Sequence, residues 1–243
     1  MGRTPLLKKI CHPERSEGPT FNPVNPTPNF DPLAKPYRWL EYLTFGPYLQ
    51  RTRTHFLNEL THCRQALVLG DGDGRFTAQL LRINPEIQIH AVDASPKMLA
   101  ALQKSAGSNA NRVTTEAADL RHWQPNTNHR YDLIATHFVL DCLTTEEVAN
   151  LAQRLTPATT PNSQWLISDF AIPENALGRG IAKSLIRLLY LVFRLLTNLR
   201  ITHLPNHPQS LTQAGWRLQH HCLHLGGLLV SQIWTRRLEQ CLR

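Results

Sequence analysis

Three glycines at alternate positions, Gly70, Gly72 and Gly74, follow an apolar run that begins at Ala66. In a turn between a buried strand and a helix, glycine permits positive φ and lets a ligand lie against bare backbone. Nineteen residues beyond the last glycine, Asp93 ends a second apolar run. A carboxylate there can accept both hydrogen bonds of a ribose diol, as the acid about 20 residues beyond the glycines does in dinucleotide folds. The spacing predicts a nucleoside-binding crossover.

A second group of residues with chemical potential lies in the segment YDLIATHFVLDCL, which contains His137 and Asp141. An imidazole or a carboxylate can take a proton from a nucleophile or orient it. We predict His137 and Asp141 as the catalytic candidates. For His137 the alternative interpretation is a hydrogen-bonded histidine at a strand end, because catalytic geometry is not visible in a sequence.

Histidines and a cysteine also cluster near the C-terminus, where His220, Cys222 and His224 would share one face of a strand. Closely spaced strand residues with no remote further ligand rarely form a closed metal site. The sequence therefore predicts no metal site.

The elements that must position these residues alternate between strand and helix. We predict strands at 66–69, 87–92, 112–117, 131–136 and 164–169, and helices at 75–83, 96–105 and 145–155. Ser95 before Pro96 predicts a capped helix start, and Thr144 with Glu147 predicts a capping box. This alternation indicates a parallel sheet that is covered on both faces.

The C-terminal part departs from the alternation. A helix is predicted at 209–214, and two β-like runs, 216–225 and 228–237, flank Gly226-Gly227. A two-residue Gly-Gly connection favours a tight hairpin, so the last two strands should be antiparallel neighbours. The predicted fold class is α/β, with a doubly wound, mostly parallel seven-stranded sheet, a C-terminal antiparallel hairpin and flanking helices.

The N-terminal part contains eight of the 17 prolines within its first 36 residues. Because proline lacks an amide donor, residues 1–30 are expected to be a disordered leader, and residues 31–243 a single domain. Two short helices are predicted within 36–60, with a break at Gly46-Pro47. Aromatic residues there are expected to wall a binding pocket; they are Tyr37, Trp39, Tyr42 and Phe45.

Residues 173–205 are expected to form an amphipathic helical insertion over this pocket. Its basic residues line one helical face; they are Arg179, Lys183, Arg187 and Arg194. Its uncharged apolar runs are far below the roughly 20 residues needed to span a bilayer. Helix 179–200 can therefore contact an anionic membrane surface or RNA, or it can be a packed lid with solvated charges.

Charge and cysteine content bound the cellular setting. The net charge is +8, and residues 173–243 carry nine basic against two acidic residues. The five cysteines are scattered and odd in number, so neither a disulfide framework nor a zinc site is suggested. No secretory signal is expected from the N-terminal sequence. We expect a cytoplasmic monomer or homodimer, with peripheral contact at the inner membrane surface as an option.

The glycine loop after the first strand, the acid after the second and the terminal hairpin together resemble the class I S-adenosylmethionine-dependent methyltransferases, over about residues 31–237. The resemblance implies a Rossmann-like sheet and S-adenosylmethionine as cofactor. It places the glycine loop, including Asp71 and Asp73, under the methionine part of the cofactor. A nicotinamide dehydrogenase is the main competitor, but its third glycine position is Arg75 here.

The resemblance also implies roles for residues that follow the later strands. Asp93, with Ala94 beside it, would hold the ribose hydroxyls, and Asp119, with Leu120 beside it, would contact the adenine. His137 would complete the cofactor-binding set and, with Phe138 and Asp141, face the methyl group and the acceptor.

One position departs from the family pattern. Members usually carry an acid two residues before the first glycine, and Val68 stands there in this chain. Either Asp71 or Asp73 replaces that acid, or both are turn residues, a common role for aspartate.

The function that these features predict is methyl transfer to an apolar or aromatic small molecule, such as a lipid, a quinone or another metabolite. Two alternatives remain open: an RNA methyltransferase, and a non-catalytic adaptor that works through its basic helix. No Asn-Pro-Pro-Tyr or Pro-Cys motif of nucleic-acid base methylation is present, which makes nucleic acid the less favoured acceptor.

Overall fold

The computed structural model of the 243-residue chain describes residues 47–126, 128–173 and 203–236, together with residues 179, 180, 182, 184 and 185. The expected leader at 1–30 and the expected aromatic wall at 37–45 lie outside the described residues. So do Lys183, Arg187 and Arg194 of the expected basic helix. The sheet, the glycine loop and the terminal hairpin are all described.

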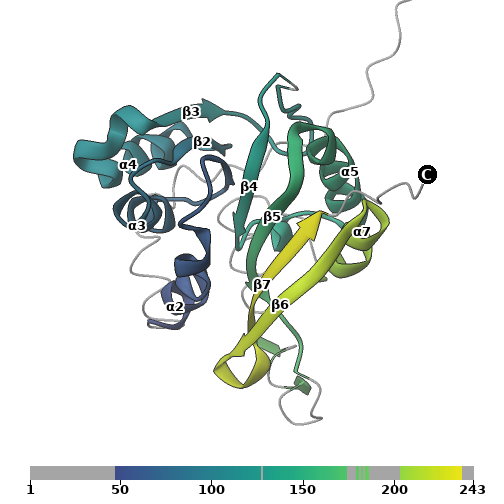
Figure 1. The fold of residues 1–243 in the computed structure, drawn as a ribbon. Coiled ribbons are helices and arrows are strands. Elements are labelled where there is room, and N and C mark those ends of the chain that lie inside the picture. Colours follow the sequence, from purple (N-terminus) through teal and green to yellow (C-terminus); the bar gives the residue numbers. More distant parts are fainter. Residues whose placement is uncertain are drawn as a thin grey trace, which may run out of the picture.

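A single seven-stranded sheet in the order β3-β2-β1-β4-β5-β7-β6 organises the molecule (Figure 1). Strands β1 to β5 pair in parallel, and β7 runs antiparallel to both β5 and β6. The strands are β1 (Gln65–Leu69), β2 (Gln88–Asp93), β3 (Val113–Ala117), β4 (Tyr131–His137), β5 (Thr159–Phe170), β6 (Trp216–His224) and β7 (Leu229–Arg236). This arrangement confirms the predicted fold class.

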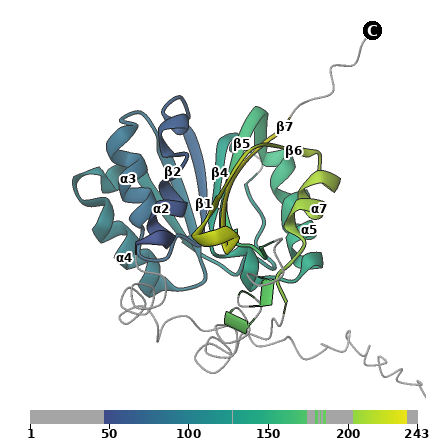
Figure 2. The same cartoon turned by 90° about the horizontal axis from the view of Figure 1, so that it is seen from below.

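Helices cover both faces of the sheet, with α2, α3 and α4 on one side and α5 and α7 on the other (Figure 2). The α-helices are α2 (Tyr48–Thr54), α3 (Arg75–Ile83), α4 (Pro96–Ala106), α5 (Thr145–Leu155) and α7 (His207–Gln213). Short 3-10 turns are η2 (Leu57–Leu60), η3 (Gly107–Arg112), η4 (Leu140–Cys142), η5 (Thr156–Ala158) and η6 (Leu225–Gly227). Within the described part of the chain, no helix has the length and apolar character needed to cross a membrane.

The helix starts are decided by local side chains. Ser95 Oγ accepts a hydrogen bond from the Met98 amide at 3.2 Å, with Pro96 at the first helical position. Thr144 and Glu147 form the predicted capping box, with bonds of 3.1 and 2.8 Å. Each device satisfies amides that the helix itself leaves without partners, so α4 and α5 begin where the sequence predicts.

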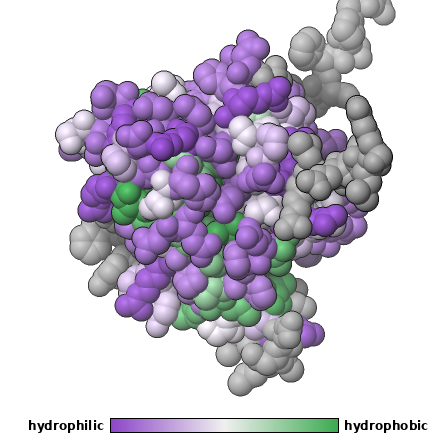
Figure 3. All heavy atoms as spheres, viewed as in Figure 1, coloured by the Kyte–Doolittle hydropathy of each residue, from purple (hydrophilic) through white to green (hydrophobic). Residues whose placement is uncertain are grey.

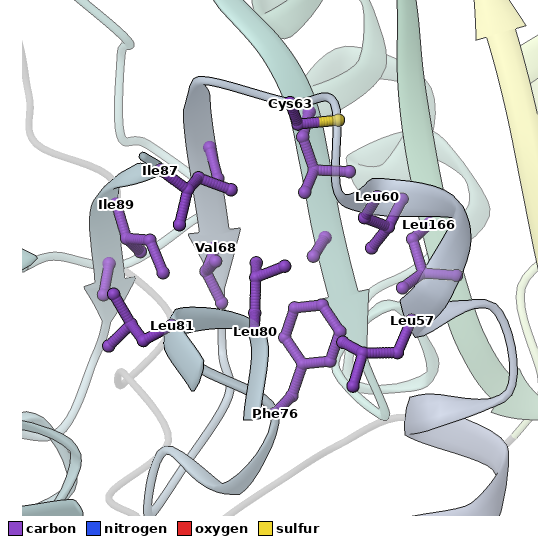
Figure 4. Close-up of a cluster of buried hydrophobic side chains, with 14 of the residues drawn as sticks. Leu57, Leu60, Cys63, Val68, Phe76, Leu80, Leu81, Ile87, Ile89 and Leu166 are labelled. Carbon is purple, nitrogen blue, oxygen red and sulfur yellow. The ribbon is translucent and has the colours of Figure 1, made fainter. Parts of the chain in front are cut away.

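Two apolar clusters fill the space between the sheet and its helices. On the α3 face, Val68, Phe76 and Leu80 pack with residues of η2 (Figure 4). On the α5 face the cluster contains Trp165 and Trp216, whose rings meet edge to face with centroids 5.3 Å apart. Alternate residues of β1 enter opposite clusters, which is the pattern of a strand buried on both faces.

Three details differ from the sequence-based expectations. The prediction of a two-residue Gly-Gly connection between the last two strands is wrong. Strand β6 ends at His224 and β7 begins at Leu229, so four residues join them, and the first three of these form η6. The longer turn arises because Leu225 and Gly226 both take positive φ, which ends the strand pairing early. Strand β5 begins at Thr159, five residues earlier than predicted. The second helix predicted before β1 is only a 3-10 turn, η2.

Candidate functional site

The glycine loop between β1 and α3 has the bare backbone that the sequence predicts. Gly70, Gly72 and Gly74 have φ values of 68°, 60° and 78°. A Cβ atom at Gly70 would lie 2.6 Å from Val139 Cγ2, and one at Gly74 would lie 2.7 Å from the Leu102 Cα. Both contacts are too short for a side chain, so packing as well as backbone conformation requires glycine at these two positions.

Asp71 is the buried acid of the glycine loop and is 6% exposed. Its Oδ2 accepts a hydrogen bond from the Thr77 amide at 2.8 Å in the first turn of α3. Its Oδ1 is buried and has no hydrogen-bond partner within the described residues. Burial raises the pKa of the Asp71 carboxyl to about 6. One oxygen of Asp71 thus holds the turn into α3, which is the turn role considered for this residue.

Asp73 has a different environment from Asp71. Its carboxylate pairs with Arg75 Nε at 2.8 Å, and both side chains are partly exposed. Its carbonyl oxygen accepts a hydrogen bond from Ser105 Oγ, which joins the loop to α4. Asp73 therefore acts mainly within the protein.

Val68 stands at the position where the resemblance predicts an acid, and the structure explains the apolar residue. Its side chain is fully buried and points into the cluster that includes Phe76 and Leu80 (Figure 4). A carboxylate there would lose its hydration among apolar groups, which is costly. Position 68 therefore suits an apolar side chain, and the buried carboxylate of this region belongs to Asp71 in the loop.

Asp93 is the last residue of β2, and Asp119 lies two residues beyond the end of β3 at the same edge of the sheet. The Ala118 amide donates to the Asp93 carbonyl oxygen at 3.0 Å, which ties the two loops together. Asp93 is half-buried, its Oδ1 accepts the Ser95 amide at 2.8 Å, and the neighbouring Ala94 is exposed. The Gly70 amide donates to the Val92 carbonyl oxygen at 2.9 Å, so the residue before Asp93 is bonded to the glycine loop.

Asp119 is held in place by its own neighbour. Burial raises the pKa of the Asp119 carboxyl. Hydrogen bonds from the side chain and the amide of Arg121 lower it together by more, so the pKa falls below its ordinary value. The side chain of Leu120 is buried in the α5-face cluster. Asp119 is thus an ionised acid at the edge, and Leu120 supplies apolar support beneath it.

His137 is the last residue of β4 and is only 2% exposed. Its ring centroid lies 4.2 Å from that of Phe76, in the first turn of α3. Neither ring nitrogen has a hydrogen-bond partner within the described residues. Burial and the positive charge of Arg53 hold the pKa of His137 well below its ordinary value. The imidazole is therefore neutral at physiological pH, and both nitrogens are available to a ligand.

Beside His137, an apolar cluster lines the other half of the edge. Phe138 has a φ of 54°, and its ring lies 5.4 Å from that of Phe170. The guanidinium of Arg53, which is 3% exposed, lies 5.0 Å from the Phe138 ring centroid. The remaining members of the acceptor-side cluster are Leu49, Cys142, Ala182, Leu185, Leu204, Leu228 and Leu229. This half of the site is apolar and aromatic, and it contains the buried cation of Arg53.

Two buried acids, Asp141 in η4 and Asp169 in β5, complete the site. Burial raises the pKa of Asp141 to about 6. Burial and repulsion by the Asp141 charge raise the pKa of Asp169 well above its ordinary value. Asp169 Oδ1 accepts the Phe170 amide at 2.8 Å. Such a pair binds a proton at a pH where an exposed aspartate has lost it.

Two residues of this site, Asp169 and Arg53, were not predicted from the sequence. Asp169 carried a signal, because it ends β5 at the same edge as Asp93 and His137. Arg53 carried none, since only the packing of α2 onto the sheet buries it beside Phe138. Every predicted site residue from Gly70 to Asp141 lies in loops or strand ends that follow β1 to β4.

A family profile described as a methyltransferase domain matches residues 66–162, which hold the glycine loop, Asp93, Asp119, His137 and Asp141. The trans-aconitate 2-methyltransferase of Mycobacterium tuberculosis is 27% identical over 148 residues, which are 58% of this chain and 52% of the relative. The chain thus spans about half the length of the curated relatives that it matches.

Solved structures share the fold at low identity. An O-methyltransferase family protein from Burkholderia thailandensis matches with a TM-score of 0.65 and 17% identity, over 88% of this chain and 65% of the other. The N-methyltransferase NodS from Bradyrhizobium japonicum WM9, in complex with S-adenosyl-L-homocysteine, matches with a TM-score of 0.53 and 14% identity, over 77% and 87%. With the profile match over residues 66–162, these findings show a methyltransferase-domain fold and support the resemblance to the class I S-adenosylmethionine-dependent methyltransferases.

Proposed function

We propose that this protein transfers the methyl group of S-adenosylmethionine to an apolar or aromatic small molecule. The cofactor supplies an electrophilic methyl group on a sulfonium. The observation that carries the proposal is the position of His137. Its neutral imidazole has no hydrogen-bond partner among the described residues and contacts the ring of Phe76 in α3. The next residue in the chain, Phe138, belongs to the acceptor-side cluster. His137 therefore lies between a nucleoside site and an apolar site.

The residues of the glycine-loop half fit the cofactor. Gly70 and Gly72 both have positive φ and present bare backbone, with no side chain, to a ligand that lies against the loop. The unpartnered Oδ1 of Asp71 suits a cationic amino group, and Asp93 suits the two ribose hydroxyls. Asp119 and Leu120 would bound the adenine. All these groups lie within loops joined by backbone hydrogen bonds.

The acceptor-side cluster supports an apolar or aromatic acceptor. Phe138 and Phe170 present two rings at the strand ends, and leucines surround them. A pocket with such walls gains free energy by removing apolar surface from water, at roughly 25 cal/mol per Å². A strongly hydrated acceptor would gain little from these walls.

Buried groups near the cluster supply proton chemistry. As the acceptor's nucleophilic atom bonds to the methyl carbon, the carbon–sulfur bond breaks and a hydroxyl or amine acceptor must lose its proton. His137, neutral at physiological pH, can accept that proton at a ring nitrogen. Asp141 and Asp169 have raised pKa values, so they also provide an acceptor for a proton within the buried site.

A carboxylate acceptor is the second candidate, and Arg53 favours it. Arg53 is 3% exposed beside Phe138 and its charge acts on Asp71, so a carboxylate acceptor in the cluster would lie near this cation. The mycobacterial relatives are named for trans-aconitate, a carboxylate. A carboxylate oxygen carries no proton at neutral pH, so its methylation needs no base.

The setting of the reaction remains a proposal as well. Of the four basic residues expected to face a membrane or RNA, only Arg179 lies within the described residues. We keep the cytoplasm, with peripheral contact at the inner membrane surface, as the expected location, and a monomer or homodimer as the expected state. RNA methylation and a non-catalytic adaptor remain the rival hypotheses.

The first experiment is a calorimetric titration of the full chain with S-adenosylhomocysteine. We expect micromolar binding, weakened about 100-fold by Asp93→Ala, because hydrogen bonds to a charged group contribute up to about 3 kcal/mol. Glu86→Ala is the matched control, since Glu86 pairs only with exposed Arg64 among the described residues. Absence of binding in the wild type, with a cooperative unfolding transition present, would favour the adaptor hypothesis.

The second experiment compares acceptors in a methyl-transfer assay with phenols, quinols and polycarboxylates. The wild type and Arg53→Met are measured on each class. Activity on the phenols that survives Arg53→Met supports the apolar or aromatic acceptor. Activity confined to polycarboxylates and lost in Arg53→Met would replace it with the carboxylate acceptor.

A further inference from the structure

Three metal-binding side chains from distant parts of the chain meet at one end of the terminal hairpin. His55 directly follows α2, whereas Cys222 and His224 belong to β6. One ligand atom of each residue lies within 4.8 Å of those of the other two. The sequence shows no remote ligand for the β6 residues, but in the fold His55 lies beside them.

The geometry of β6 explains why two of these side chains point to the same place. Cys222 and His224 are two residues apart, so they share a face of the strand, while their neighbours His221 and Leu223 face away. Cys222 packs against the α3-face cluster, which includes Phe56. Because Phe56 is the neighbour of His55 in sequence, that packing brings the third ligand to β6. The rings of His55 and His224 are 5.0 Å apart, edge to face.

Two polar atoms at this place lack the partners that buried polar atoms normally have. His224 Nε2 is buried and has no hydrogen-bond partner within the described residues. Ser231, directly opposite Cys222 on β7, has a buried Oγ in the same condition. An unsatisfied buried polar atom costs about 1 to 3 kcal/mol. A ligand held by Cys222 and His224 would remove the cost at the imidazole.

We infer that His55, Cys222 and His224 bind a divalent metal ion of the zinc class. Two imidazoles and one thiolate are ligands that zinc prefers, and three protein ligands leave its fourth position for water or another ligand. Zinc bonds of about 2.0 to 2.3 Å place ligand atoms about 3.5 Å apart, which side-chain rotations can reach from 4.8 Å. His55 is exposed, so the ion has a path from solvent.

A metal ion here would connect two elements that border the acceptor side of the site. His55 lies two residues after Arg53, whose guanidinium contacts Phe138. Strand β6 pairs with β7, which begins with Leu229 of the acceptor-side cluster. In Figure 3 the hydrophobic residues of this view gather in its lower half, where Figure 1 places α2 and the hairpin. The ion would hold α2 against the sheet.

The test is metal binding by the full chain under reducing conditions. Zinc is titrated calorimetrically, and cobalt is followed by the charge-transfer absorption of a cobalt–thiolate bond. We expect one zinc per chain with a dissociation constant at or below micromolar. Cys222→Ser and His224→Gln should each weaken binding at least about 100-fold, since even outer-shell changes weaken metal sites 10- to 100-fold. Cys222→Ser should abolish the thiolate absorption.

His221→Gln is the matched control, because His221 is an exposed histidine on the same strand with its side chain on the other face. It should bind zinc like the wild type. His55→Gln tests whether the remote ligand takes part. The proposal is overturned if 100-fold excess zinc does not bind to a folded wild type, or if binding is unchanged in Cys222→Ser and His224→Gln.

Discussion

The two halves of the site are built in different ways. In the glycine-loop half, between β1 and β3, the polar groups mostly have partners close in sequence: Asp73 pairs with Arg75, Asp93 accepts the Ser95 amide, and Asp119 pairs with Arg121. In the acceptor half, Arg53 comes from α2 and lies over the ring of Phe138, which comes after β4, so these two residues meet only in the folded protein. A short motif can therefore specify the first half but not the second.

The two halves also differ in the state of their ionisable groups. Asp119 is partly exposed, and its pKa is lowered by hydrogen bonds from Arg121. Asp141 and Asp169 are buried, and their pKa values are raised. Asp71 is the exception in the glycine-loop half, because burial raises its pKa to about 6.

The largest expected effect tests whether the glycine-loop half depends on close packing. Gly74→Ala should lower the free energy of unfolding by about 3 to 4 kcal/mol, from left-handed backbone strain and from a Cβ that overlaps Leu102. Gly226→Ala is the matched control, since Gly226 has nearly the same φ and ψ but no atom within 4 Å of a new Cβ. It should cost only about 1 kcal/mol. Urea unfolding measures both, and equal losses would contradict the packing argument.

A second prediction concerns Asp71, the exception noted above. Its folded pKa of about 6 exceeds its ordinary value of 3.8, so the folded state binds the proton more tightly. Its stabilising contribution is therefore present below about pH 4 and is lost as the pH rises to about 6, by up to about 3 kcal/mol. Asp71→Asn keeps an acceptor for the Thr77 amide but does not titrate. Its unfolding free energy should change less between pH 4 and pH 7 than that of the wild type.

The measurement is chemical unfolding at several pH values between 4 and 7. Asp73→Asn is the control, because Asp73 is partly exposed and pairs with Arg75. Identical pH profiles for the wild type and Asp71→Asn would mean that Asp71 is better solvated than its burial indicates. The comparison between the two halves would then hold without exception.

The smallest effect should be the same in both halves. Ser95→Ala removes the cap of α4 in the glycine-loop half, and Thr144→Ala removes that of α5 near the acceptor half. Each should cost about 1 kcal/mol, the usual value of a cap. Thermal unfolding of both variants checks this. A loss well above 2 kcal/mol in either variant would show that the helix start has a tertiary role.

Local features were predictable because their causes are local. Helices α3 and α5 have the predicted bounds, and α4 extends one residue further, since capping side chains and apolar spacing define their starts. The turn between β6 and β7 was predicted as two residues but has four. Its length depends on the positive φ values of Leu225 and Gly226, which the sequence pattern does not reveal. The glycine loop and Asp93 were predictable because consecutive parallel strands end at one edge.

The sequence by itself determined the order of strands and helices, the bare glycine loop and the acids that follow β2, β3 and β4. Each of these depends on residues within a few positions or on one crossover. Only the tertiary structure decided that Arg53 lies over Phe138, that the Asp141 charge raises the pKa of Asp169 in a buried site, and that His55 meets Cys222 and His224. These contacts join elements distant in the chain, and burial, which no short segment encodes, determines their charge states.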